Sequence, residues 1–250
     1  MITYEDMKGR VAVVTGAASG IGRATAEEFA ANGAVSVFAD INLDGAQSAA
    51  DVVMQNGGKA CAIKLDVRKY PEIEEAVKSV IDRFGHIDYW INVAGGYAGR
   101  IRNKDVKFRE YDIETLDWGL DVNLRGTMYC CRAIVGHMMD RKFGKIINLG
   151  SVAGCVGSEH AIDYATEKSG IIGLTKSLGM YLGPYGVNCN CVSPGPVLSR
   201  PEMSALPTYL GRAAQPKEVA DLIMYLCSEK ASFITGHNYV IDGGRCWGTK

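Results

Sequence analysis

The stretch Thr15-Gly16-Ala17-Ala18-Ser19-Gly20-Ile21-Gly22 decides the fold, because it follows the apolar residues 11–14 and opens a helix-like segment at residues 23–32. A strand, a glycine turn and a helix start leave backbone N–H groups and the positive end of the helix dipole facing whatever lies over the turn. A Cβ at Gly16, Gly20 or Gly22 would block the turn, the phosphates or the helix–strand packing. The stretch therefore predicts a dinucleotide pyrophosphate site, in a G-x-x-x-G-x-G variant of the usual fingerprint.

The bulk properties favour one soluble α/β domain that spans residues 1–250, since 47% of the residues are apolar and can form a large core. The net charge of -1 gives the whole chain no attraction for nucleic acid or an anionic membrane. The first ten residues contain no apolar signal-peptide core, and no apolar run is long enough to span a membrane. We expect a cytoplasmic protein.

The eight cysteines form no C-x-x-C pair and lie at no ligand spacing from a histidine. We expect buried free thiols, as in a reducing cytoplasm, with neither a disulfide nor a metal site.

Short apolar segments alternate with amphipathic ones from end to end. Strands are expected at residues 11–14, 35–39, 60–65, 87–93, 145–149, 187–192 and 239–241. Helices are expected near residues 20–32, 44–55, 71–84, 115–142, 161–182 and 217–227. This alternation predicts a single doubly wound, parallel, seven-stranded sheet of Rossmann type with helices on both faces.

Polar or glycine residues follow six of these strands, and ligands of such sheets bind beyond the carboxyl ends of the strands. The residues at these ends are Thr15-Gly16, Asp40, Asp66-Val67, Asn92-Val93-Ala94-Gly95, Ser151 and Ser193-Pro194-Gly195. Six such ends on one rim predict a binding site there.

Asp40 follows the second strand, eighteen residues after Gly22. A carboxylate there accepts hydrogen bonds from the adenosine ribose and repels a 2′-phosphate. Neither Ser19 nor Ile41 is a cation that could pair with that phosphate, so NAD is predicted over NADP. Asp66, beside Val67, is expected to bind the adenine amine, with helix capping as the alternative.

Tyr164 and Lys168 are four residues apart in a helix-compatible segment and share a face. Lowering a tyrosine pKa by about three units from its usual value takes about 4 kcal/mol, which an ammonium and an oxidised nicotinamide ring can provide. Such a tyrosine can exchange a proton with an alcohol or ketone. Ser151 can bond the reacting oxygen, and Asn123, unfavourable within a helix, is expected to hold a water or kink the helix.

Together these motifs resemble the short-chain dehydrogenase/reductase family over essentially the whole chain. The resemblance is carried by Thr15 to Gly22, Asn92-Val93-Ala94-Gly95, Asn123, Ser151, Tyr164-Ala165-Thr166-Glu167-Lys168, Pro194-Gly195, Phe233-Ile234-Thr235-Gly236 and Val240-Ile241-Asp242-Gly243-Gly244. The chain departs from the family at Val93, where an asparagine is usual, and at Ser199, where a threonine is common.

The resemblance implies hydride transfer between NAD(H) and a carbon that bears a hydroxyl or carbonyl group. Tyr164 would be the general acid/base, Ser151 would polarise the substrate oxygen, Lys168 would bond the nicotinamide ribose, and Asn123 would hold a relay water. Cofactor contacts are expected from Gly16, Ser19, Gly20, Ile21, Gly22, Asp40, Ile41, Asp66, Val67, Asn92, Ala94, Gly95, Tyr164, Lys168, Pro194, Gly195, Val197 and Ser199. The family also implies a homotetramer, packed through the helices that bear Asn123 and Tyr164.

The substrate is left open among hydroxysteroids, sugars, polyols and small keto compounds. Five basic residues between Arg100 and Arg109 favour an acidic or polyhydroxylated substrate if they face the site, and are otherwise a solvated loop. Two other functions stay open: an NADP-dependent reductase of 3-oxoacyl thioesters, and a non-catalytic NAD-binding sensor.

Overall fold

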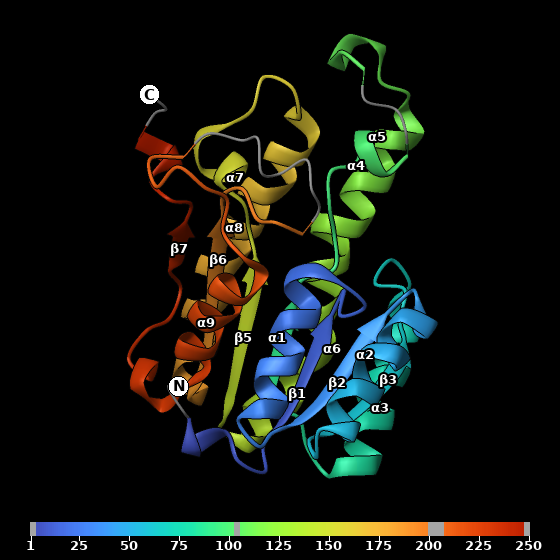
Figure 1. The fold of residues 1–250 in the computed structure, drawn as a ribbon, viewed down its shortest axis with the longest axis vertical. Coiled ribbons are helices and arrows are strands. Elements are labelled where there is room, and N and C mark those ends of the chain that lie inside the picture. Colours follow the sequence, from blue (N-terminus) through green and yellow to red (C-terminus); the bar gives the residue numbers. More distant parts are fainter. Residues whose placement is uncertain (1–3, 103–105, 200–207, 248–250) are drawn as a thin grey trace.

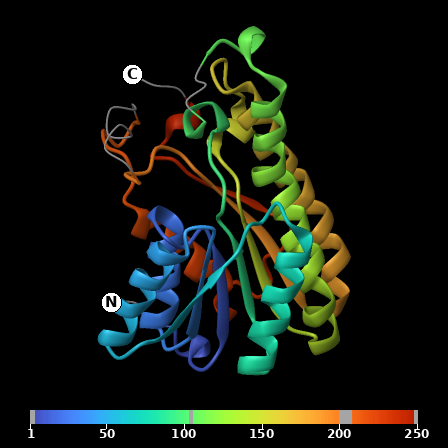
Figure 2. The same cartoon turned by 90° about the vertical axis from the view of Figure 1, so that its right-hand side faces the viewer.

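The computed structural model describes residues 4–102, 106–199 and 208–247. Of residue 247 it describes the backbone alone. Within these ranges the chain forms a central sheet with a layer of helices on each face (Figures 1 and 2). A search of the described helices finds none with the length and apolar content needed to cross a bilayer.

The sheet has seven strands, all parallel, in the order β3-β2-β1-β4-β5-β6-β7. The strands are β1 Val11–Thr15, β2 Val35–Asp40, β3 Lys59–Lys64, β4 Tyr89–Asn92, β5 Gly144–Leu149, β6 Val187–Pro194 and β7 Asn238–Ile241. The chain starts in the middle of the sheet, builds outward to β3, and returns to add β4 on the other side of β1. The doubly wound parallel sheet expected from the sequence is confirmed, and its switch point lies between β1 and β4.

The longer helices are α1 Gly20–Ala31, α2 Leu43–Gln55, α3 Tyr70–Phe84, α5 Ile113–Gly119, α6 Gly126–Arg141, α8 Ile162–Leu182 and α9 Pro216–Cys227. Two single-turn helices, α4 Ala98–Ile101 and α7 Val152–Val156, were not expected from the sequence. Short 3₁₀ turns lie at Glu5–Met7, Phe108–Glu110, Gly183–Tyr185, Glu229–Ala231 and Arg245–Trp247.

Two hydrophobic clusters hold the layers together, one on each face of the sheet. Ala12 and Val14 pack with residues of α1, α2 and α9, whereas Val11 and Val13 pack with residues of α3 and α6. Successive strand residues point to opposite faces, so a strand buried on both sides needs an unbroken apolar run. This is the pattern that made β1 recognisable.

The long helical stretch expected at residues 115–142 is confirmed, and it consists of α5, a π-helical segment η3 Leu120–Arg125 and α6, which follow one another directly. Asn123 lies in this segment, and its Nδ2 donates to the carbonyl oxygen of Gly119 at 3.2 Å. A side chain that hydrogen-bonds to a backbone carbonyl oxygen within its own helix disturbs the regular i→i−4 backbone hydrogen bonds. The disturbance turns Asn123 inward, toward the ends of the strands.

Candidate active site

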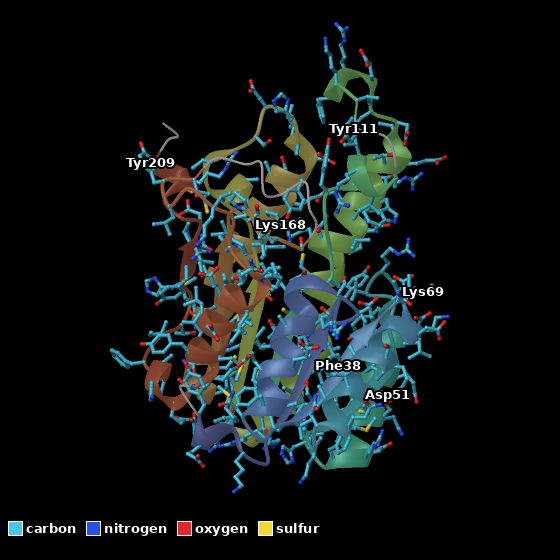
Figure 3. The ribbon with its side chains drawn as sticks, in the orientation of Figure 1. Phe38, Asp51, Lys69, Tyr111, Lys168 and Tyr209 are labelled. Carbon is cyan, nitrogen blue, oxygen red and sulfur yellow. The ribbon has the colours of Figure 1, made fainter. Side chains whose placement is uncertain are left out.

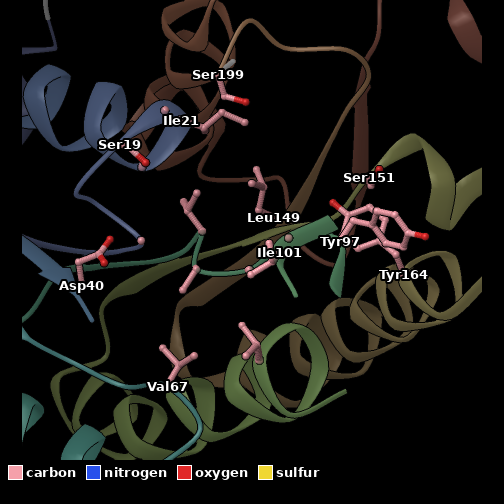
Figure 4. A pocket seen from close by; sticks show the side chains of 18 of the residues that line it. Ser19, Ile21, Asp40, Val67, Tyr97, Ile101, Leu149, Ser151, Tyr164 and Ser199 are labelled. Atoms are coloured by element: carbon pink, nitrogen blue, oxygen red, sulfur yellow. The ribbon is translucent and has the colours of Figure 1, made fainter. Parts of the chain in front are cut away.

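A cavity of about 670 Å³ lies beyond the carboxyl ends of the central strands (Figure 4). Of the residues expected at the site, the cavity is lined by Gly16, Ser19, Gly20, Ile21, Gly22, Asp40, Ile41, Asp66, Val67, Ala94, Gly95, Ser151, Tyr164, Pro194, Gly195, Val197 and Ser199. Asn92, Asn123 and Lys168 lie behind this wall. Asp40 and Tyr164 lie at opposite ends of the view, so one continuous space joins the glycine turn to the tyrosine.

The glycine turn is shaped for a close approach of another group. Gly16 and Gly20 have φ of 68° and 56°, which side chains rarely tolerate. A Cβ on Gly16 would lie 2.9 Å from the backbone of Ala94, and a Cβ on Gly22 would collide with the Gly16 carbonyl. Ser19 precedes α1 without capping it through its side chain, and the first residues of α1, Gly20 to Gly22, line the cavity. This cradle fits the pyrophosphate of a dinucleotide.

Thr15, the last residue of β1, holds this turn against the loop after β4. Its Oγ1 accepts hydrogen bonds from the backbone N–H groups of Val93 and Ala94, both at 3.1 Å. Thr15 was expected at a strand end beside the site, but its role as a hydrogen-bond acceptor for the loop after β4 was not predicted. Because Val93 is held through its backbone, its apolar side chain leaves this contact intact.

Asp40 lies at the far end of the cavity, on the last residue of β2. Its Oδ2 accepts from the N–H of Ala18 at 2.9 Å, and its Oδ1 accepts from the N–H of Asn42 at 2.8 Å. Each carboxylate oxygen can accept a further hydrogen bond, because an ionised carboxylate offers about four lone-pair sites. The arrangement fixes a negative group beside the glycine turn, as a ribose with free hydroxyls requires.

Asp66 carries a partner that the sequence analysis missed. Its Oδ1 accepts from Arg68 Nε at 2.9 Å and its Oδ2 accepts from Arg68 Nη2 at 2.6 Å. This bidentate bond lowers the pKa of Asp66 below its usual value. The alternative prediction, that Asp66 caps a helix, is wrong, because the N-cap residue of α3 is Lys69. Both Asp66 and Arg68 line the cavity, so a guanidinium stands at the end where adenine is expected.

Tyr164, Lys168 and Ser151 meet at the other end. The Lys168 Nζ lies 5.5 Å from the centre of the Tyr164 ring, one helical turn away on α8. Lys168 is buried and donates to the carbonyl oxygen of Leu149 at 2.7 Å, and this burial lowers the pKa of Lys168 to about 8. Figure 3 shows Lys168 at the strand ends, above Phe38 in β2. Ser151 caps α7, its Oγ accepting from the N–H of Ala153 at 3.2 Å.

Asn123 does not reach the cavity, because its side chain is engaged with the loop after β4. Its Oδ1 accepts from the N–H of Gly96 at 2.8 Å, and its Nδ2 donates to the Gly96 carbonyl at 2.9 Å. Its Nδ2 also donates to Oε2 of Glu167 at 2.7 Å, and its carbonyl accepts from Thr127 Oγ1 at 2.7 Å. Asn123 thus holds both the N–H and the carbonyl oxygen of Gly96 in place.

Asn92 is likewise buried and braces the strands. Its Nδ2 donates to Oδ1 of Asn148 on β5 at 2.9 Å, and its Oδ1 accepts from Trp90 Nε1 at 2.8 Å. Asn92 therefore does not line the cavity, whereas its neighbours Val93, Ala94 and Gly95 do.

Aromatic and aliphatic side chains form the wall beside the tyrosine. The Tyr97 and Tyr164 rings meet edge to face with centres 6.4 Å apart, and the Tyr111 hydroxyl donates to that of Tyr97 at 2.5 Å. Ile101 and Trp118 complete this part of the lining.

Of the basic residues between Arg100 and Arg109, Arg100 lines the cavity. Arg102 and Arg109 pair with Glu114 at 3.6 Å and Glu110 at 3.2 Å. Lys107 is exposed and does not line the cavity, and Lys104 falls outside the described residues. The basic loop is therefore mostly a surface feature.

All eight cysteines are free, as expected, but Cys155 is exposed and Cys246 is half-buried, so the expectation that all are buried is wrong for these two. Among the residues that the structure describes, no group of three histidine, cysteine, aspartate or glutamate side chains is placed to hold a metal ion.

Known proteins resemble this chain over nearly its whole length. A family model described as "Enoyl-(Acyl carrier protein) reductase" matches residues 16–245. The chain is 35% identical to a cyclohexanol dehydrogenase of Acinetobacter sp. (strain SE19), over 97% of each chain. It is also 35% identical to a 3-oxoacyl-[acyl-carrier-protein] reductase of Synechocystis sp., over 95% of this chain and 97% of the other. The crystal structure of gox2181 superposes with a TM-score of 0.88 at 28% identity, over 96% and 97% of the two chains.

Proposed function

The chain belongs to the short-chain dehydrogenase/reductase family of oxidoreductases, and from this premise we propose that it transfers a hydride between NAD(H) and a secondary alcohol or its ketone. The observation that carries the proposal is one cavity that joins the glycine turn and Asp40 to Ser151 and Tyr164, with the Lys168 ammonium directly behind the tyrosine. A dinucleotide that spans this cavity would present its nicotinamide to the tyrosine.

The cavity fits a dinucleotide, since it extends from the glycine turn and Asp40 to Ser151 and Tyr164, and the turn keeps its shape only with glycine at Gly16 and Gly22. The nicotinamide, when bound, supplies or accepts the hydride. Tyr164 removes the alcohol proton during oxidation and returns it during reduction. The positive charge of Lys168 favours the phenolate of Tyr164, and Ser151 bonds the substrate oxygen and orients it toward the tyrosine.

NAD is proposed over NADP because of Asp40. Its carboxylate is fixed by two backbone N–H groups and would repel a 2′-phosphate. The one guanidinium at that end of the lining, Arg68, is bound to Asp66 in a bidentate pair. Isothermal calorimetry with each dinucleotide tests this proposal, and equal affinities would overturn it.

A second candidate function is the NADP-dependent reduction of a 3-oxoacyl thioester, favoured by the name of the Synechocystis relative. Asp40 argues against it. A non-catalytic NAD sensor would need no buried lysine behind a tyrosine, so the set of Ser151, Tyr164 and Lys168 argues against that function.

A substrate screen separates these functions. Cyclohexanol, a hydroxysteroid, a sugar alcohol and a 3-hydroxyacyl thioester are each incubated with NAD or NADP, and absorbance at the wavelength of the reduced nicotinamide is followed. We expect turnover of at least one free alcohol with NAD. Turnover of the thioester alone with NADP would favour the reductase, and no turnover by a protein that binds NAD would favour the sensor.

We further propose that residues 1–250 act as one cytoplasmic domain, which assembles into a homotetramer and binds a small-molecule substrate rather than nucleic acid or membrane. Exposed apolar side chains on α6 and α8, among them Met128, Met180 and Tyr181, support an association through these helices. Light scattering after size-exclusion chromatography measures the assembly, and a monomer at micromolar concentration would contradict it.

A further inference from the structure

A carboxyl group that the proposed reaction does not use lies between the two proposed catalytic residues of α8. Glu167 stands directly before Lys168 and three residues after Tyr164. Its side chain is completely buried, and Asp163, one turn earlier, is 7% exposed. Acidic side chains are rarely buried without a specific reason, so the position of Glu167 requires an explanation.

The two oxygens of Glu167 have different surroundings. Oε2 accepts a hydrogen bond from Asn123 Nδ2 at 2.7 Å. Oε1 is buried against Gly119 on α5 and has no hydrogen-bond partner. The neutral carboxyl costs less than the ionised one here, because Oε2 still accepts from Asn123 and no negative charge is buried without a partner on Oε1.

The charges around Glu167 favour this neutral form near neutral pH. Burial and the neighbouring Asp163 raise the pKa of Glu167 to about 7, against the opposing effects of Asn123 and Lys168. On the packed π-helical segment, Asp121 and Arg125 pair with each other. The side chain therefore changes its charge within the pH range in which such an enzyme works.

Asn123 connects Glu167 to the cavity wall. Because Oε2 of Glu167 accepts from the amide nitrogen, the amide oxygen of Asn123 faces the N–H of Gly96, at 2.8 Å. The adjacent Gly95 lines the cavity, and a Cβ on Gly95 would collide with that amide oxygen and lie 3.8 Å from Lys168 Nζ. Glu167, Asn123 and the Gly95–Gly96 peptide thus form one chain of contacts that ends beside the lysine.

We propose that Glu167 is a positioning residue for the reaction: it orients the Asn123 amide, which fixes the Gly95–Gly96 peptide beside Lys168, and when ionised it helps to keep Lys168 charged. The inference rests on the proposed function for Tyr164 and Lys168. The second part rests on the place of the two groups: Glu167 is next to Lys168 on α8, and the contacts through Asn123 and Gly95 lead from its carboxyl to the Lys168 ammonium. There the negative Glu167 raises the pKa of Lys168, whereas burial lowers it.

Two substitutions separate orientation from charge. Glu167→Gln keeps a carbonyl oxygen that can accept from Asn123 but cannot ionise, whereas Glu167→Ala removes both. With NAD and an alcohol from the screen, we expect the alanine variant to lose about tenfold or more in kcat, because the Asn123 amide is no longer fixed. We expect the glutamine variant to recover most of this loss. Equal losses in the two variants would overturn the orienting role.

The pH profile tests the charge. In Glu167→Gln the alkaline limb of kcat/KM, where Lys168 loses its proton, should move to lower pH by about half a unit. The exposed Glu75→Gln is the matched control and should leave the limb in place. An unmoved limb in Glu167→Gln would overturn the electrostatic role, because a purely structural carboxyl changes the amplitude of the profile and not its position.

An infrared readout does not depend on turnover. The carbonyl stretch of a protonated buried carboxyl should titrate near pH 7 in the wild type without substrate. The band should be absent in Glu167→Gln and present in Glu75→Gln. If the wild type oxidises no alcohol, the proposed function fails while this titration still stands. If the enzyme turns over and the band is missing, the inference about Glu167 fails alone.

Discussion

Replacement of Glu167 by glutamine should stabilise the protein at alkaline pH far more than at acid pH. The pKa of Glu167 is raised from an ordinary 4.5 to about 7 by burial and by Asp163. The folded state therefore favours the neutral form. The stability that this form contributes is fully present below pH 4.5 and is lost as the pH rises from 4.5 through 7. A glutamine at this position is neutral throughout and does not share that loss.

The magnitude follows from the difference between the two pKa values. Each pKa unit corresponds to 1.36 kcal/mol, so a shift of about two and a half units costs the wild type roughly 3 kcal/mol above pH 7. At pH 5 most of this cost is absent. The free energy of unfolding gained by Glu167→Gln should therefore be about 2 kcal/mol larger at pH 8 than at pH 5. Any fixed cost of burying the glutamine amide cancels in this difference.

Urea unfolding at pH 5 and pH 8 measures the effect, with protein concentration held constant because assembly also changes apparent stability. Glu75→Gln, on the exposed face of α3, is the control and should show no difference between the two pH values. A gain for Glu167→Gln that is equal at pH 5 and pH 8 would show that Glu167 is ionised in both conditions, which would contradict a raised pKa for this buried carboxyl.

Three further substitutions test other parts of the structure. Asp40→Ser removes the carboxylate that repels a 2′-phosphate, so calorimetry should show the ratio of NADP to NAD affinity rise by about tenfold or more, and an unchanged ratio would count against the assignment. Gly22→Ala drives a Cβ into the Gly16 carbonyl and should abolish NAD binding in calorimetry, so wild-type affinity would disprove the cradle. Asp88→Asn weakens a fully buried carboxylate that pairs with Arg10 at 3.2 Å and Arg141 at 3.1 Å. It should lower the free energy of unfolding by about 3 kcal/mol in urea, whereas a loss below about 1 kcal/mol would contradict that pairing.

The sequence was sufficient for the sheet because its central strands are buried on both faces and mostly apolar, as residues 11–14 are, whereas the edge strands β3 and β7 are only partly buried. It was also sufficient to gather most of the cavity lining, since parallel strands bring their carboxyl ends to one edge. The glycine turn and Asp40 follow from that rule alone.

A kink at Asn123 was one of the two outcomes expected there, but the π-helical form of η3 and the burial of Glu167 could not be predicted from the sequence. The contacts of Asn123 depend on tertiary structure, because Gly96, which is distant in sequence, offers it both a donor and an acceptor. In the sequence, Glu167 has the appearance of an exposed charge on a helix. It is buried because α5 and η3 pack against α8. The spacing of Asp163 and Glu167, two acids four residues apart on one face, was the available signal.

Arg68 shows a different limit of the sequence. Its neighbour Asp66 was expected to bind adenine, and nothing in the order Asp66-Val67-Arg68 shows that the guanidinium folds back onto the carboxylate. The loop conformation decides this contact, and loop conformations are set by tertiary packing rather than by periodicity.

Tyr164, with Lys168 behind it, is proposed to move the proton when a hydride passes to or from a bound nicotinamide. The decisive experiment is the rate of NADH formation by Tyr164→Phe, with NAD binding measured by calorimetry. Since a positioned general acid or base contributes about 10²–10⁴-fold, the variant should bind NAD normally and lose at least about a hundredfold in kcat. A variant that binds NAD and oxidises the alcohol at the wild-type rate would contradict the account.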